Sequence, residues 1–384
     1  MEFFDLRYNK VTGHLPLWMG ARWPELKALS LSNNHMSGVL PEGLGGLQKL
    51  KTLTLANNNF TASLNPIMNL KSLEFLYLEK NRFEGNVDDE FLQDMENLVQ
   101  VDISSNDLGG QDLPLHLFQH SSLQVLDLSD NSIMGTIPLF NILDNTAMQY
   151  LGLSDNILTG SLPESIVKLK SLRHLDVTGN DLIGTMPASL AGMPKLTYVF
   201  LSENGFDKGP IPDFFGDMKQ LRELSLSGTQ RTGALPSEWL GELNHLVLFD
   251  VSYNEMTGSI PSVIWEHPNL SYLLLNRNKF TGDLPAGISD DTKLNMLLLD
   301  NNSITGDLTE ACQKLKIDWL IADCQEISCE CCKCCADNEP RCNDDILYAN
   351  NDFSWEYNYT RVAYAFSPEI LFEATPKVRT TVGH

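Results

Sequence analysis

The chain has 384 residues, with 50 acidic against 27 basic side chains and a formal net charge of −23 at pH 7. This surplus of carboxylates repels a phosphate backbone, so we expect no nucleic-acid partner. No run of about 18 uncharged apolar residues is present, so the sequence predicts no transmembrane segment. The first ten residues, "MEFFDLRYNK", have neither the basic nor the apolar region of a signal peptide.

One segment recurs along most of the chain. "LKALSLSNNHMSGVLP" (26–41) returns as "LQVLDLSDNSIMGTIP" (123–138) and "LRHLDVTGNDLIGTMP" (172–187), in the frame LxxLxLxxNxLxGxLP. A fixed period of this length is the signature of a repeat protein. The anchor asparagines of the frame are Asn9, Asn34, Asn58, Asn81, Asn106, Asn131, Asn156, Asn180, Asn204, Asn254, Asn278 and Asn302, and Thr229 occupies the remaining anchor position.

Each repeat predicts a short strand at its LxL core, because apolar and other residues alternate there, followed by a Gly-Pro turn. A single repeat cannot bury its leucines alone. Stacked repeats bury them in a continuous core and align the strands into a parallel sheet on a concave face. The predicted fold is therefore an α/β solenoid, a curved right-handed superhelix of about 13 repeats.

After each proline, apolar residues lie three apart, as in "PEGLGGLQKL" (41–50) and "PESIVKLKSL" (163–172). This spacing predicts 3₁₀ or short helical turns on the convex face. We interpret the anchor asparagines as a structural ladder, because an amide can satisfy backbone groups that the sheet leaves unpaired. Thr229 can satisfy fewer of these groups, so its repeat is the expected site of a local irregularity.

The chain opens inside a repeat, since "FFDLRYNKVTGHLP" (3–16) already holds a strand, an anchor and a turn. An uncovered solenoid end exposes its core. Either the true start is truncated, or another chain covers this end. We favour truncation, which places a signal peptide or membrane anchor in the missing part.

The outward positions of the predicted strands are where a ligand would bind. Most carry Ser, Thr or Asp, and the aspartates invite a cation or basic-ligand hypothesis, although "LDLS" is ordinary for such repeats. Aromatic residues depart from that background, and rings among carboxylates suit a peptide or glycan contact surface. The candidate ligand-binding residues are Tyr77, Asp102, Asp127, Tyr150, His174, Asp176, Tyr198 and Phe200, which we expect to be displayed to solvent beside Tyr272 and Leu274.

Catalytic and metal-binding patterns are scarce. "HLFQH" (116–120) places two histidines four residues apart, but no HExxH glutamate accompanies them. His120 and His267 follow a proline by six residues, where other repeats place a core residue, so we interpret both as core substitutions. The sequence predicts no enzyme, no metal and no cofactor.

All eight cysteines lie between residues 312 and 342, where the repeats stop, and "CECCKCC" (329–335) holds five of them. A thiolate metal cluster would add negative charge to an acidic segment and would lack a nearby histidine. We therefore favour a disulfide-bonded cap in an oxidising compartment. Neighbouring cysteines should pair outward, since adjacent cysteines bridge only with strain. The predicted disulfide cysteines are Cys312, Cys324, Cys329, Cys331, Cys332, Cys334, Cys335 and Cys342.

The domains predicted from these patterns are a solenoid (1–309), a Cys-rich cap (310–342) and an aromatic tail (343–384). "DFSWEYNYT" (352–360) alternates aromatic residues on one face of an expected strand, which either packs on the last repeat or forms a second contact surface or dimer edge. Secretion gains support from four N-x-S/T triplets, the candidate glycosylation sites Asn59, Asn269, Asn301 and Asn358.

The repeat frame, with its "TGSLP" (159–163) and "TGSIP" (257–261) segments, resembles the plant-type leucine-rich repeat. That repeat occurs in ectodomains of plant receptor-like kinases and receptor-like proteins and in polygalacturonase-inhibiting proteins. The Cys-rich end is similar to that of algal leucine-rich-repeat surface proteins. No kinase Gly-rich loop, HRD or DFG triplet is present, so the resemblance implies binding rather than phosphorylation.

We therefore predict an extracellular or cell-surface recognition module whose concave face binds a protein, a peptide or a carbohydrate. The alternative that the resemblance leaves open is an inhibitor of a cell-wall hydrolase. A purely structural surface protein would need a flat array of identical residues, which the mixed outward positions do not supply.

Overall fold

The computed structural model describes residues 1–110, 112–140, 142–289, 291–315 and 317–335. The chain divides into two compact units, Met1–Cys334 and Cys335–His384. The aromatic tail predicted over 343–384, with its expected strand, lies outside the described residues. The repeats, their turns and most of the Cys-rich segment belong to the first unit, and the description below concerns that unit.

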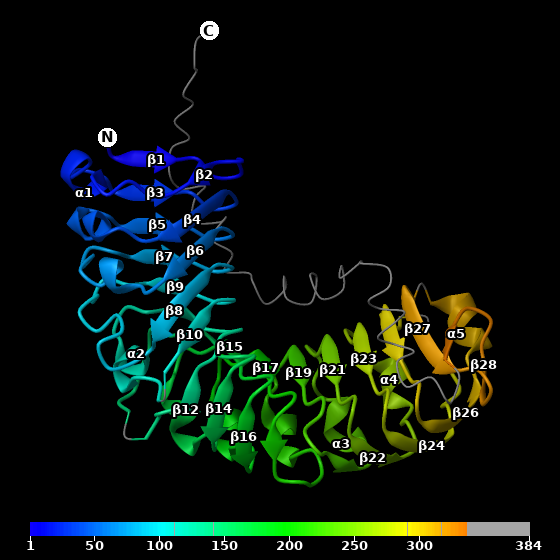
Figure 1. Cartoon of the computed structure of the whole chain (residues 1–384). Coiled ribbons are helices and arrows are strands. Elements are labelled where there is room, and N and C mark those ends of the chain that lie inside the picture. The colour runs from blue at the N-terminus through cyan, green and yellow to red at the C-terminus, as the bar shows by residue number, and fades with distance from the viewer. Residues whose placement is uncertain (111, 141, 290, 316, 336–384) are drawn as a thin grey trace. The chain divides into compact units, whose positions relative to one another are not determined.

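A fifteen-stranded sheet runs along the inner side of the repeat array (Figure 1). Successive strands from β1 to β27 pair in parallel and in the same register, so that Tyr150 lies beside His174 and His174 beside Tyr198. The α/β solenoid predicted from the repeats is thereby confirmed. The strands are β1 (Phe3–Asp5), β3 (Ala28–Ser30), β5 (Thr52–Thr54), β7 (Phe75–Tyr77), β9 (Gln100–Asp102), β11 (Val125–Asp127), β13 (Tyr150–Gly152), β15 (His174–Asp176), β17 (Tyr198–Phe200), β19 (Glu223–Ser225), β21 (Leu248–Asp250), β23 (Tyr272–Leu274), β25 (Met296–Leu298), β27 (Trp319–Asp323) and β29 (Lys333–Cys335).

A second set of strands follows the anchor positions and was not predicted, because the Gly-Pro segment indicated only a turn. These strands form three shorter parallel ribbons. The first holds β2 (Thr12–Gly13), β4 (His35–Val39), β6 (Asn59–Ala62), β8 (Arg82–Asn86) and β10 (Asp107–Gly109); the second holds β12 (Met134–Thr136), β14 (Ile157–Gly160), β16 (Asp181–Gly184) and β18 (Gly205–Phe206); the third holds β20 (Thr232–Gly233), β22 (Glu255–Gly258), β24 (Lys279–Asp283), β26 (Ser303–Asp307) and β28 (Ile327–Ser328).

Short helices occupy the outer side of the array, as the apolar spacing after each proline predicts (Figure 1). None of the helices in the described ranges has the length and apolar composition needed to cross a bilayer. The α-helices are α1 (Met19–Arg22), α2 (Leu115–Gln119), α3 (Ser237–Leu240), α4 (Val263–Glu266) and α5 (Thr309–Lys314), and the 3₁₀ helices are η1 (Glu42–Gly46), η2 (Asn65–Ile67), η3 (Glu164–Lys168), η4 (Ala188–Gly192) and η5 (Asp213–Asp217).

The core lies between the inner strands and the outer turns. The strand residues Leu29 and Leu151 and the turn residues Leu44 and Leu169 are all at most 1% exposed. Because each repeat repeats the same geometry, these leucines join into one continuous apolar cluster.

The anchor asparagines make the same set of hydrogen bonds in successive repeats. Asn156 Nδ2 donates to the carbonyls of Leu128, Leu153 and Ser154 at 3.0, 3.3 and 3.0 Å, and its Oδ1 accepts from the backbone N–H of Ile133 at 3.0 Å. One amide therefore ties its own turn to the preceding repeat. The same pattern holds at Asn34, Asn58, Asn180 and Asn278.

The residue before each anchor adopts a left-handed backbone conformation. Glu203 and Tyr253 both have φ of 52°, a region that costs L-residues other than Asn or Asp free energy. Gly179, at φ 63°, is one of two glycines at this position. The next residue is the anchor, and the hydrogen bonds of its side-chain amide hold the turn in this conformation.

The irregularity expected at Thr229 is found. Its hydroxyl donates to the carbonyl of Leu226 at 2.6 Å, while the guanidinium of Arg231, only 3% exposed, donates to the carbonyls of Thr229, Pro210 and Asp207. The ribbon of short strands ends at β18 and restarts at β20 at this point. Arg231 therefore satisfies backbone groups around the site where the anchor amide is missing.

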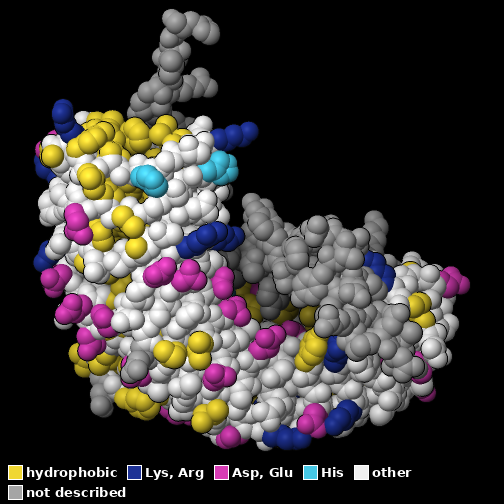
Figure 2. Space-filling view, viewed as in Figure 1, with side chains coloured by type: hydrophobic (Ala, Val, Ile, Leu, Met, Phe, Trp, Pro, Cys, Tyr) yellow, Lys and Arg dark blue, Asp and Glu magenta, His cyan; other side chains and the backbone are white. Residues whose placement is uncertain are grey.

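The first repeat leaves a group of apolar side chains exposed (Figure 2). Phe3, Tyr8, Leu17 and Trp18 are each more than half exposed. What covers this end, a preceding segment or another chain, stays a prediction.

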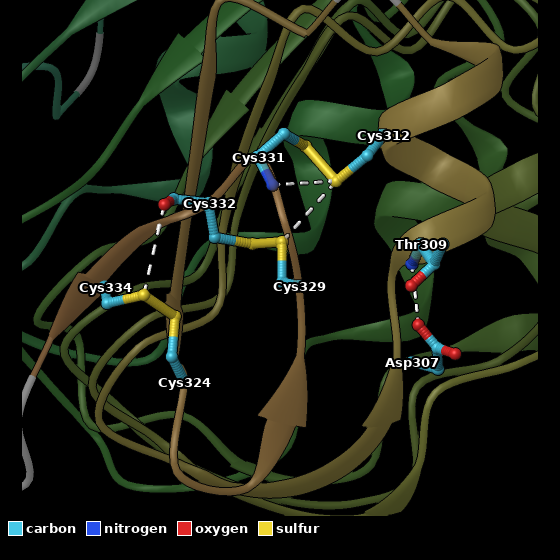
Figure 3. Close-up of a disulfide and its surroundings, with 8 residues drawn as sticks. All are labelled: Asp307, Thr309, Cys312, Cys324, Cys329, Cys331, Cys332 and Cys334. Carbon is cyan, nitrogen blue, oxygen red and sulfur yellow. Dashed lines mark hydrogen bonds between the residues drawn. A yellow bond between two sulfur atoms is a disulfide. The ribbon is translucent and has the colours of Figure 1, made fainter.

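Beyond residue 309 the repeat architecture continues. Strand β27 pairs with β25, and β28 pairs with β26, so both layers of the array extend into the Cys-rich segment. Helix α5 begins where Asp307 Oδ1 accepts a hydrogen bond from the N–H of Thr309 at 2.7 Å (Figure 3).

Three disulfides join this segment (Figure 3): Cys312–Cys331, Cys324–Cys334 and Cys329–Cys332. None of them joins adjacent cysteines, in agreement with the expected outward pairing. The Sγ atoms of Cys312, Cys329 and Cys331 lie within 4.8 Å of one another, but all three belong to disulfides. The side chain of Cys335 and the whole of Cys342 lie outside the described residues.

Core dependence is testable at Leu151, which is 1% exposed in β13. Leu151→Ala should lower the free energy of unfolding by about 2 to 5 kcal/mol, because it removes buried methyl groups and leaves a cavity. Ile157→Ala, at a 44% exposed position of the same repeat, is the control and should have little effect. Equal denaturant midpoints for the Leu151 variant and the parent would contradict the assigned register.

The cap is testable by peptide mapping without reduction. Digests should contain the pairs Cys312–Cys331, Cys324–Cys334 and Cys329–Cys332. Reduction should lower the thermal midpoint, because the cross-links restrict the unfolded chain. Stoichiometric zinc or copper, together with thiols that alkylate once the metal is removed, would instead support the metal-cluster alternative.

Candidate ligand-binding site

The outward positions of the inner sheet form two columns, the first and third residues of each three-residue strand. In β13, β15 and β17 these positions hold Tyr150, His174, Asp176, Tyr198 and Phe200. The three strands are immediate neighbours in register, so five candidate residues lie together on one surface.

The aromatic rings of this surface stack on one another. The ring centroids of Tyr150 and His174 are 4.3 Å apart with nearly parallel planes, and His174 lies 5.2 Å from Phe200 and 5.8 Å from Tyr198. The expectation that these rings are displayed to solvent is wrong for Tyr150, His174 and Phe200, which are at most 5% exposed. Neighbouring strands about 4.8 Å apart bring large outward side chains into contact, so they cover one another. Tyr198 is half-buried.

His174 has an unusual environment. Neither ring nitrogen has a hydrogen-bond partner in the described part of the chain, and burial lowers the pKa of the imidazole to about 3. The ring is therefore neutral at physiological pH. It acts as a flat, stacked element between Tyr150 and Tyr198 rather than as a proton donor.

The carboxylates follow the third-residue column. Asp102 and Asp127 are register partners on β9 and β11, and Asp176 lies two strands beyond Asp127. Burial raises the pKa of Asp102, with Glu79 and Asp127 adding to the shift, and burial raises the pKa of Asp176 to about 6. The aspartates are thus held in a low-polarity surface.

These aspartates also have a structural role. Asp102 Oδ1 accepts hydrogen bonds from the N–H and hydroxyl of Ser104, and Asp127 Oδ1 accepts from the N–H of Ser129, each at 2.7 to 3.0 Å. Asp176 does the same with Thr178. These bonds do not support the hypothesis that the aspartates bind a cation, because their Oδ1 atoms already accept hydrogen bonds from the turn.

Tyr77 is the most distant of the candidate residues from the aromatic group. It lies on β7 beside Asp102, and its hydroxyl donates to Gln100 Oε1 at 2.5 Å. Only 5% of Tyr77 is exposed, contrary to expectation, and burial raises its pKa. The hydroxyl is thus held against the neighbouring strand β9 by this hydrogen bond.

An apolar continuation of the outward surface was largely missed. From β21 onward the outward positions hold Leu248, Met296, Leu298 and Ile321, each at most 2% exposed, in addition to the predicted Leu274 at 8%. The signal was present in the sequence as leucine, methionine and isoleucine at positions that elsewhere carry Ser, Thr or Asp.

The histidines of the outer side serve the turns. His120 Nε2 contacts the carbonyl of Met95 at 3.2 Å, and its Nδ1 accepts from the N–H of Leu123. His267 makes the equivalent contacts with the carbonyl of Leu243 and the N–H of Leu270. His116 Nε2 instead contacts the carbonyl of Phe91 at 2.8 Å.

The candidate glycosylation sites differ in accessibility. Asn59 and Asn301 are exposed, whereas Asn269 is half-buried and its Nδ2 donates to the carbonyl of Asn244 at 2.7 Å. Asn358 lies outside the described residues.

The parallel inner sheet, the amide ladder and the short outer turns define the class of protein as a leucine-rich-repeat solenoid. Comparison with known families agrees: the family described as "Leucine-rich repeat region" matches residues 107–234, and the family described as "Leucine rich repeat" matches residues 24–83 and 219–280. The chain is a leucine-rich-repeat protein.

Its similar curated proteins are plant receptor-like proteins. Receptor-like protein EIX2 of Solanum lycopersicum is 32% identical over 122 residues, and receptor-like protein 18 of Arabidopsis thaliana is 34% identical over 128 residues. These alignments cover 32% and 33% of this chain. The chain matches only 12% and 15% of the lengths of these two relatives.

Similar solved structures include plant receptors and a leucine-rich-repeat protein of Leptospira interrogans, which gives a TM-score of 0.62 at 32% identity and covers 76% of this chain and 70% of that one. The ectodomain of the receptor kinase GASSHO1/SCHENGEN3 from Arabidopsis thaliana, in complex with CASPARIAN STRIP INTEGRITY FACTOR 2, superposes with a TM-score of 0.72 at 35% identity, covering 83% of this chain and 38% of that one. The peptide hormone receptor RGFR1 in complex with RGF2 gives a TM-score of 0.69 at 28% identity, covering 83% and 54%.

Glu223 provides a pH test of the outward surface. It is 3% exposed, its Oε2 has no partner in the described ranges, and burial raises its pKa to about 7. Between the unfolded pKa near 4.5 and about 7, the unfolded chain releases this proton first, so the glutamate lowers stability as pH rises through that window.

Glu223→Gln should therefore gain stability relative to the parent as pH rises from about 4.5 to 7, by up to about 3 kcal/mol. Urea unfolding of both proteins across this range gives the difference directly, and the titration of other groups cancels in it. A difference that is constant with pH would contradict the raised pKa.

Proposed function

We propose that this chain is a non-enzymatic, extracellular recognition module that binds an extended peptide on its inner sheet. The supporting observation is the in-register outward surface of β13 to β23, where aromatic side chains lie beside buried carboxyl groups. Such a surface offers contact area and some selection for charge. That the ligand is a peptide is part of the proposal.

The accessible part of this surface consists of Tyr198, Tyr272 and Asp176, all half-buried. The stacked rings of Tyr150, His174 and Phe200 form a rigid floor behind them. A rigid floor lowers the entropy cost of binding, because fewer side chains become ordered when the ligand arrives.

The similar structures support a peptide over other ligand classes. RGFR1 was solved with RGF2, and PEPR1, with a TM-score of 0.66 at 27% identity, was solved with AtPEP1. Those ligands belong to those receptors. For this chain they favour a peptide, while a carbohydrate remains an outcome of the test.

The proposed extracellular location rests on the disulfides. Six cysteines form three bonds within residues 312–334, and such density is typical of proteins that fold in an oxidising compartment. The similar receptor-like proteins agree with this location.

The test uses a random 12-residue peptide library displayed on phage and selected on the parent protein. Tyr198→Ala with Tyr272→Ala should weaken the selected peptides at least tenfold, because both rings are accessible on the proposed surface. Thr52→Ala, at the same half-buried strand position on β5, is the control and should leave affinity unchanged. Isothermal titration calorimetry measures each dissociation constant.

Equal binding by the tyrosine double variant and the parent would refute the assignment of the inner face. Failure of isolated peptides to bind, with tight binding of a folded cell-wall hydrolase, would favour the inhibitor alternative. Phe200→Ala is avoided as a binding probe, because Phe200 is 5% exposed and its truncation should cost about 3 to 5 kcal/mol of stability.

A further inference from the structure

A depression of about 560 Å³ lies on the flank of the array, where the chain enters strands β17 to β25. We call it the flank groove. It is lined by Thr197, Gln220, Arg222, His245, Asn269 and Lys293 among others. Thr197 and Arg222 directly precede the outward residues Tyr198 and Glu223, so the groove borders the inner face.

The charge of the flank groove is opposite to that of the whole chain. Although acidic residues outnumber basic ones 50 to 27 in the sequence, the lining residues include Arg222, His245 and Lys293 and no carboxylate. An adjoining depression shares Gln220 and His245 with the groove. Its one lining carboxylate, Glu242, is paired with Lys219 at 2.7 Å.

Two cations at the same repeat positions in an N-terminal repeat are neutralised by carboxylates. Lys49 and Lys51 occupy the positions that Lys293 and Arg222 occupy in their own repeats, three residues and one residue before the first residue of the strand. Lys49 pairs with Glu25 and Lys51 with Glu74, each at 2.6 Å. These cations therefore have a carboxylate partner on an adjacent repeat.

Arg222 and Lys293 have no ion pair within the described residues. Lys293 Nζ donates to Asn269 Oδ1 at 2.9 Å. Arg222 directly precedes Glu223, the register partner of Tyr198, and its positive charge partly offsets the rise that burial causes in the pKa of Tyr198. Both side chains lie at exposed positions. Strands β19 and β25 are three spacings of about 4.8 Å apart, so Arg222 and Lys293 would each contact a separate carboxylate.

We propose that the flank groove binds the side-chain carboxylates of an acidic peptide segment. This inference rests on the proposed function, since the remainder of the peptide would lie on the inner face. Thr197 and Arg222 line the groove and directly precede the register partners Tyr198 and Glu223, so the two surfaces are continuous and one extended ligand can reach both. A uniformly anionic polysaccharide fits less well, because it would meet Asp102, Asp127 and Asp176 on the inner face.

The probe is a fluorescein-labelled peptide of six glutamates, with a six-glutamine peptide as its neutral counterpart. Binding to the full chain is measured by fluorescence anisotropy at several salt concentrations. The protein is first treated with an endoglycosidase, because Asn269 heads an N-x-S triplet and lines the groove. The parent should bind the glutamate peptide, lose affinity as salt rises, and not bind the glutamine peptide.

The matched variants remove two positive charges each. Arg222→Gln with Lys293→Gln should weaken the glutamate peptide at least tenfold, whereas Lys49→Gln with Lys51→Gln should change its affinity less than twofold. Thermal midpoints of both double variants should match that of the parent, because all four side chains are on the surface. This comparison separates the groove from a general effect of net charge.

Equal losses in the two double variants, or no loss in either, would overturn the inference. An oligouronate of equal charge that binds more tightly than the peptide, and is lost with Arg222 and Lys293, would also overturn it by assigning the groove to a glycan. The outcome is independent of the inner-face test. The glutamate-peptide assay reports on the groove through Arg222 and Lys293, whereas the selected peptides report on the inner face through Tyr198 and Tyr272. Failure of one proposal is therefore distinguishable from failure of the other.

Discussion

The side-chain amide of the anchor asparagine is the interaction on which the array depends. From Asn34 onward the amide donates to carbonyls of its own turn and of the preceding repeat, and it accepts an N–H. A single side chain thus satisfies backbone groups that the inner sheet and the short ribbons leave unpaired. The left-handed residue before it, such as Asp155, is held in place by the same bonds. Stacking of the leucines follows, because successive repeats then share one register.

The fold could be predicted from the sequence because its signals are local and repeated. The LxL strands, the turns after each proline and the exceptional Thr229 all follow from residue type and spacing. The ribbons of short strands were missed, because their residues, as in Ile157–Gly160, include the glycine that reads as a turn. Arg231 was missed for a different reason: its role depends on carbonyls of the preceding repeat, which spacing alone does not bring together.

The candidate site was predicted less completely. Grouping Tyr150, His174 and Tyr198 needed only the repeat period, but their burial depends on contacts between neighbouring strands. The flank groove could not be predicted from the sequence, because Arg222 and Lys293 look like ordinary surface cations. They stand out only in the folded chain, where Lys49 and Lys51 are seen to have carboxylate partners. Absence of a partner is a property of the folded chain and has no sequence pattern.

The ribbon of short strands is interrupted at Thr229, as it also is between β10 and β12, and at Thr229 the side chain of Arg231 replaces the anchor amide. In a linear array each repeat is stabilised only by its neighbours, so a weakened junction limits how far order or disorder spreads from one end. Repeats before β18 and after β20 should therefore exchange their amide protons as separate cooperative units, with Arg231 setting the coupling between them. Cross-links at Cys312 to Cys334 would then protect the repeats after β20 without slowing the opening of those before β18.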